Sequence, residues 1–131
     1  MPRKTDSANP RDWLLFAGYD IDVLTTLIPQ QIAFPACCSK LGEELEKLLK
    51  ADLIHQGWQL RKIHDLQALR EDLEELDPRR AEDLRTIVDA LADSYIETRY
   101  PGFDLTDEDW PRLQELLTFV EQYRDELQKK L

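Results

Sequence analysis

Apolar side chains recur every three or four residues from Trp13 to Leu127, and this period limits most strongly what the chain can fold into. Such spacing lines one face of an α-helix, whereas a strand would alternate polar and apolar residues. The sequence shows no convincing strand pattern and no internal repeat. The pattern predicts an all-α fold, a single-domain antiparallel bundle of four long helices plus a shorter one.

Proline residues and capping signals divide the chain into these helices. Asn9-Pro10 and Asp77-Pro78 each combine a capping side chain with a proline suited to a first turn. The predicted helices begin near residues 10, 35, 64 and 78, and a last one follows a capping box at 106–109. The third helix is expected to start at about His64, and the fourth to run unbroken toward Pro101. Residues 1–9 are expected to be a flexible N-terminus, and 10–131 one helical domain.

The charge balance argues against one class of partner. The 131 residues include 17 basic and 27 acidic side chains, which gives a formal net charge of −10. A surface this acidic repels nucleic-acid phosphates at long range. Non-specific DNA binding is therefore not expected. Only a local basic patch or a basic partner would overcome the repulsion between the acidic surface and the phosphates.

The two cysteines, Cys37 and Cys38, are neighbours. Neither a zinc site nor a secreted disulfide framework follows from them, and we expect small core residues in a reducing cytoplasm. The first residues lack the apolar core of a signal peptide, and no apolar run approaches membrane-spanning length. The sequence predicts no membrane association, no metal and no cofactor.

Two lysines of the second predicted helix are candidate ligand contacts. Lys47 and Lys50 follow Glu43 and Glu46 at the i,i+4 spacing of a solvated, paired helix face. The alternative is a cationic wall that faces a nucleotide or the acidic surface of a partner. Periodicity does not separate these interpretations. Asp20 lies on the apolar stripe of the first helix, so its carboxylate is expected to be either half-exposed or paired.

His64 and Arg99 each allow a structural and a functional interpretation. His64 follows Arg61 and Lys62, so it is either a polar helix entrance or a phosphate contact beside helix N-terminal amides. Arg99 ends the fourth predicted helix, where the helix dipole alone favours a cation. The alternative role is stabilisation of developing phosphate charge.

Three strings in the middle of the chain carry a family resemblance. They are the segment 46–51, the triplet His64-Asp65-Leu66 and the segment Arg99-Tyr100-Pro101-Gly102. In this order on a helical background, the chain resembles the HEPN family (higher eukaryotes and prokaryotes nucleotide-binding domains) from about Asp12 to Tyr123. The resemblance implies a small prokaryotic helical bundle tied to nucleotide or RNA biology. It also implies a homodimer, paired with a minimal nucleotidyltransferase in a toxin–antitoxin-like two-component system.

The family's ribonuclease motif is absent from this chain. That motif is an arginine followed, after four to six residues, by a histidine that transfers a proton. No histidine follows Arg99, and the chain's two histidines are His55 and His64. The resemblance therefore implies a nucleotide-binding or regulatory module without catalytic residues. Its candidate contacts are Lys47, Lys50, His64 and Arg99, which are expected to converge near one cleft. The alternatives are an atypical ribonuclease or toxin that uses Arg99 and His64, or a non-catalytic scaffold.

Overall fold

All regular structure in the described part of the chain is helical. A computed structural model describes residues 3–99, 101 and 107–131, and within 93–99 it describes the backbone but not the side chains. The helices are α1 (Pro10–Leu27), α2 (Phe34–His55), α3 (Leu66–Leu76), α4 (Pro78–Asp83), α5 (Arg85–Arg99) and α6 (Trp110–Lys130). The predicted all-α bundle is confirmed. None of these helices combines the length and the apolar character needed to cross a lipid bilayer.

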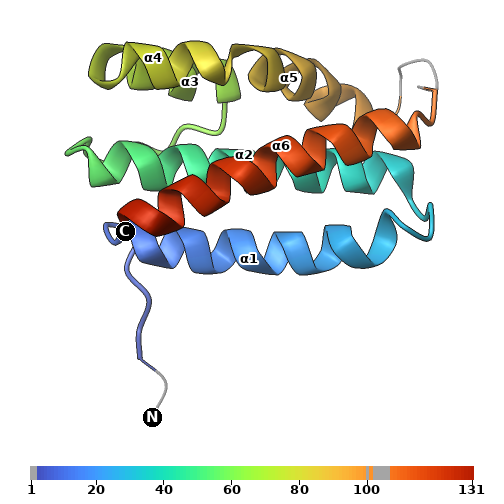
Figure 1. The fold of residues 1–131 in the computed structure, drawn as a ribbon, viewed down its shortest axis with the longest axis horizontal. Helices are drawn as coiled ribbons and strands as arrows, with labels where there is room; N and C mark the ends of the chain where they lie inside the picture. Colours follow the sequence, from blue (N-terminus) through green and yellow to red (C-terminus); the bar gives the residue numbers. More distant parts are fainter. Residues whose placement is uncertain (1–2, 100, 102–106) are drawn as a thin grey trace.

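Helix α2 forms the centre of the bundle. It packs against α1, α3, α5 and α6. Figure 1 shows α1 along one side of α2, α3 to α5 on the opposite side, and α6 running obliquely across α2. The C-terminal end of α6 thereby comes back to the beginning of α1.

The core is built from leucines of α2 and from those that neighbouring helices turn toward it. Leu41, Leu45, Leu48 and Leu49 are fully buried, and each contributes about 1.5–3 kcal/mol through burial. Because α2 has neighbours on nearly all sides, burial extends beyond the predicted apolar face. Its buried polar residues are Glu44, Lys50 and Asp52.

Side-chain caps begin the helices close to the predicted positions. Asn9 accepts a hydrogen bond from the Arg11 amide at 3.0 Å, directly before Pro10. Asp77 caps α4 by accepting from the Arg80 amide. Asp109 caps α6, of which Pro111 is the second residue. Of the predicted capping box at 106–109, Thr106 lies outside the described residues.

Two predicted helix boundaries were wrong. The third helix begins at Leu66 rather than at His64, because the side chain of Asp65 accepts from the amides of Gln67 and Ala68 and sets the first turn. The predicted fourth helix is divided into α4 and α5 at Leu84. The backbone of Leu84, with φ −90° and ψ −5°, leaves regular helical geometry while its side chain stays in the core.

The described part of the N-terminal segment contacts the start of α1. Arg3 pairs with the buried carboxylate of Asp12, and the Asp6 amide donates to the same carboxylate at 2.8 Å. The Trp13 indole donates to the main-chain oxygen of Ser7. These contacts connect the N-terminal segment to the start of α1, and the flexibility expected for residues 1–9 stays a prediction.

Candidate functional site

Lys47 is held in a salt bridge between α1 and α2. Its Nζ lies 2.6 Å from the Asp20 carboxylate, which is 4% exposed and also lies 3.7 Å from Lys40. Of the two expectations for Asp20, half-exposed or paired, the structure shows the second, because the carboxylate is buried and has two lysine partners. The Lys47 ammonium is committed to this carboxylate and does not form a free cationic wall.

Lys50 and His64 meet at one carboxylate. The Lys50 Nζ and the His64 Nδ1 each lie 3.2 Å from the same oxygen of Glu46. Lys50 is 2% exposed, and its ammonium stands 5.1 Å from the centre of the Trp13 ring, in cation–π geometry. The His64 side chain is 71% exposed. The structure therefore brings two of the four sequence candidates together, one buried and one open to solvent.

The fourth candidate cannot be added to this cluster. Arg99 is the last residue of α5, as the sequence indicated, but its side chain lies outside the described residues, as do Tyr100 and Gly102. Lys47 points to Asp20 instead of Glu46. The convergence of all four residues on one cleft stays a prediction.

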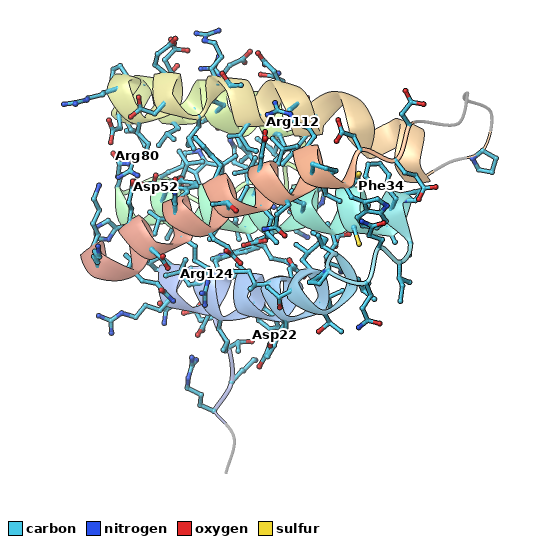
Figure 2. All side chains as sticks on the ribbon, turned by 45° about the vertical axis from the view of Figure 1, so that its right-hand side comes forward. Asp22, Phe34, Asp52, Arg80, Arg112 and Arg124 are labelled. Carbon is cyan, nitrogen blue, oxygen red and sulfur yellow. The ribbon has the colours of Figure 1, made fainter. Side chains whose placement is uncertain are left out.

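A second polar network connects three helices and was not predicted from the sequence. Asp52 of α2 is 1% exposed and accepts a hydrogen bond from the Tyr123 hydroxyl of α6 at 2.6 Å. The Gln56 side chain donates to its other oxygen at 2.9 Å. Arg80 of α4 brings its Nε to 3.8 Å from Asp52 and pairs with Glu126 at 2.5 Å. We call Asp52, Tyr123, Arg80 and Glu126 the Asp52 network, and Figure 2 shows Asp52 and Arg80 facing each other between α2 and α4.

Burial and charge fix the protonation of Tyr123. Complete burial, followed by the negative charge of Asp52 and the hydrogen bond to it, raises the pKa of Tyr123 well above its usual 10. The hydroxyl therefore stays protonated and acts as a donor, while Arg80 lies over its ring with 5.5 Å between guanidinium carbon and ring centre. A pocket of about 300 Å³ opens beside Arg80, Phe119 and Tyr123. The arginine of this pocket, Arg80, is already held by the carboxylates of Asp52 and Glu126. The main role of the Asp52 network is therefore to connect helices.

A buried carboxyl without a hydrogen-bond partner lies between α1, α2 and α6. Glu44 is fully buried, and neither of its oxygens has a partner among the described residues. Burial raises its pKa to about 8, with the charges of Asp20 and Glu121 adding to the effect and those of Arg124 and Lys47 opposing it. At neutral pH this side chain is therefore mostly protonated.

A signal for the buried acids exists in the sequence, but none exists for their partners. Glu44 and Asp52 stand three and four residues from buried leucines, on the same helical stripe as Leu41 and Leu48. Arg80 and Tyr123 reach Asp52 from distant parts of the chain, which no local pattern encodes. Among the described residues, no three His, Cys, Asp or Glu side chains gather as metal ligands.

Comparison with known proteins gives one finding that bears on function. The HEPN domain family model matches residues 10–129, nearly the whole chain. Comparison with curated proteins finds no significant match, and neither does comparison with solved structures. The helical bundle agrees with the matched family, which is associated with nucleotides and RNA. The chain therefore belongs to the HEPN domain family.

Proposed function

We propose that this HEPN domain is a non-nucleolytic nucleotide-binding or regulatory module of the cytoplasm, working as a homodimer beside a minimal nucleotidyltransferase in a toxin–antitoxin-like pair. The observation that carries the proposal is a HEPN match over residues 10–129 in a chain that lacks the arginine–histidine spacing of the family's ribonucleases. RNA cleavage requires a group that transfers a proton. Because no histidine follows Arg99, the chain lacks this group at the position where the family's ribonucleases carry it.

An exposed apolar stripe on α1 supports the homodimer. Leu15, Phe16, Tyr19 and Val23 are each at least 40% exposed, and the rings of Phe16 and Tyr19 touch edge to face at 5.7 Å. Helical spacing places the four side chains on one side of α1, away from α2. A second copy of the same helix, crossing about a twofold axis, would cover this stripe with matching apolar surface. Burial of such a stripe favours association.

The dimer is tested by sedimentation of wild type and two lysine variants. We expect wild type to sediment at about twice the 15.4 kDa chain mass, and Tyr19→Lys to sediment as a monomer, because a desolvated ammonium opposes association. Leu76→Lys is the matched control, since Leu76 is 44% exposed on α3, on the far side of α2. A monomeric wild type would contradict the dimer, and a dimeric Tyr19→Lys would contradict this face.

We place the partner contact on the connection that follows α2, residues 56–64, which ends in His64. Lys47 and Lys50 are engaged by Asp20 and Glu46, so they support a ligand role less than the exposed imidazole does. Arg61 on the same segment is also largely exposed, while it pairs with Asp72. An acidic patch on a partner would therefore bind this segment more favourably than it would bind the rest of this chain's acidic surface.

Pull-down from native lysate at low salt, followed by mass spectrometry, tests the two-component proposal. We expect recovery of a small nucleotidyltransferase in near-equal amount, and reduced recovery with His64→Ala. His55→Ala is the control, because His55 is the last residue of α2, about two and a half helical turns from Glu46, the carboxylate that His64 contacts. Recovery of the chain alone would contradict the pairing. Cleavage of RNA by purified wild type but not by Arg99→Ala would instead favour the ribonuclease alternative.

A further inference from the structure

A pocket with two arginines lies between the start of α1 and the end of α6. Its volume is about 380 Å³, and its lining residues are Arg11, Leu14, Leu15, Arg124, Gln128 and Leu131. These lining residues carry no side-chain carboxylate, and the acceptor that the structure gives Arg11 there is the main-chain oxygen of Leu131. In a chain with a net charge of −10, two arginines on one concave surface form a local exception to the acidic field. We call this the Arg124 pocket.

Arg124 enters the pocket without a hydrogen-bond acceptor. No described residue accepts from its guanidinium, and its buried Nε has no partner. Figure 2 shows Arg124 in the space between α6 and α1. Gly18 leaves room for it, because a Cβ on that residue would stand 3.1 Å from an Arg124 terminal nitrogen. A glycine inside a long helix is otherwise unfavourable, so its position here fits a need for space.

Arg11 completes the pair of cations. Its Nε donates to the main-chain oxygen of Leu131 at 3.0 Å, and one terminal nitrogen donates to the same oxygen. This contact holds the guanidinium at the pocket and leaves its other terminal nitrogen as a donor.

The nearest buried acid does not cancel the charge of Arg124. Burial, with Asp20 and Glu121 adding, raises the pKa of Glu44 to about 8, so the carboxyl is mostly neutral at pH 7. Asp20 is paired with Lys47 and Lys40. Glu121, one turn earlier on α6, accepts no hydrogen bond from Arg124 in the structure. The guanidinium therefore keeps its donors and its charge for an anion.

We propose that the Arg124 pocket binds the phosphate group of a nucleotide, with Arg11 and Arg124 as its two cationic contacts. Guanidinium groups donate paired hydrogen bonds that match phosphate oxygens. Leu14 and Leu131, which also line the pocket, supply apolar surface for the ribose or base. This inference rests on the nucleotide-binding role proposed above and gives it a location that excludes Lys47 and Lys50.

Titration followed by NMR, including the arginine Nε–H signals, tests the site with three probes. We expect AMP to bind with a dissociation constant between about 10 µM and 1 mM. Inorganic phosphate should bind the same residues more weakly, and adenosine should bind at least about tenfold more weakly than AMP. Adenosine binding as tightly as AMP would overturn the proposal, because the phosphate would then not be what is recognised.

Four variants locate the binding. Arg11→Gln and Arg124→Gln should each weaken AMP binding by about tenfold or more. Gly18→Ala should weaken it to a smaller extent, since its methyl group would stand 3.1 Å from an Arg124 terminal nitrogen and the guanidinium must shift slightly, while alanine favours the helix. Arg112→Gln is the matched control, because Arg112 lies in the first turn of α6, away from the pocket, and pairs with Glu115. It should bind like wild type.

The outcomes separate this inference from the proposed function. AMP binding that is unchanged in Arg11→Gln and Arg124→Gln would overturn the site and leave the nucleotide-binding role standing. Absence of binding of both AMP and phosphate to wild type at about 10 mM would overturn both. The homodimer and the partner are measured by sedimentation and pull-down, so their failure would be seen independently.

Discussion

The hydrogen bond from Tyr123 to Asp52 can be removed by one atom's change. Tyr123→Phe deletes the hydroxyl and keeps the ring, so the apolar packing of α6 and the cation–π contact with Arg80 remain. Among the described residues, the Asp52 carboxylate oxygen that accepted the bond then has only the Arg80 Nε, 3.8 Å away, as a neighbouring donor. With Asp52 1% exposed, water cannot readily replace the lost donor.

The magnitude follows from the type of bond. At 2.6 Å, the hydroxyl–carboxylate distance falls in the range of charge-assisted hydrogen bonds. Hydrogen bonds to charged groups contribute about 1.5–3 kcal/mol to stability. We therefore expect Tyr123→Phe to lower the free energy of unfolding by about 2 kcal/mol. At a urea dependence of about 2 kcal/mol per molar, the midpoint moves by about 1 M.

Urea unfolding monitored by circular dichroism measures this shift. Tyr19→Phe is the control, because it removes the same atom from a side chain whose hydroxyl makes no hydrogen bond among the described residues, and it keeps the apolar ring of the proposed dimer face. That variant should stay within about 0.5 kcal/mol of wild type. A double-mutant cycle with Asp52→Asn then isolates the pair, with an expected coupling of about 0.5–3 kcal/mol. Wild-type stability of Tyr123→Phe, or a coupling near zero, would refute the reasoning.

Two further predictions concern buried acids and thiols. Because burial raises the pKa of Glu44 from 4.5 to about 8, the folded state keeps a proton that the unfolded chain releases, so wild-type stability falls as pH rises through that window. Urea unfolding at several pH values should show the free energy of unfolding of Glu44→Gln rising relative to that of wild type as pH goes from 5 to 9. Parallel profiles would contradict this. Burial also raises the pKa of the Cys37 thiol, and that of Cys38 to about 11. Both thiols should resist alkylation at pH 8 until urea unfolds the chain, and stoichiometric labelling of native protein would oppose this.

The sequence was sufficient for the fold because its signals are local. Apolar residues at helical spacing, the Asn9 and Asp77 caps and the prolines behind them place α1 and the start of α4 within a residue or so. Each such signal acts within one turn of helix. The break at Leu84 has no glycine or proline to mark it, and the two helices that it separates have different neighbours, since α4 packs on α3 and α5 packs on both α2 and α3.

The polar sites could be read only in part, because a side chain's partner depends on tertiary packing. Asp20 was recognisable as an acid on an apolar stripe, yet its partner Lys47 lies on another helix. Lys50 looked like a solvated lysine, and it is buried because α1 brings Trp13 over it. The Gly18–Arg124 contact joins residues more than a hundred positions apart, which periodicity does not register.

The central position of α2 has a consequence for how the chain folds. The α1–α2 hairpin can form from neighbouring segments soon after synthesis, since it needs only a short connection. The Tyr123 bond to Asp52, by contrast, closes a loop of 71 residues and waits for α6. Until α6 emerges from the ribosome, one side of α2 stays open, with its leucines and its buried acids in contact with water. We therefore expect docking of α6 to complete the native bundle.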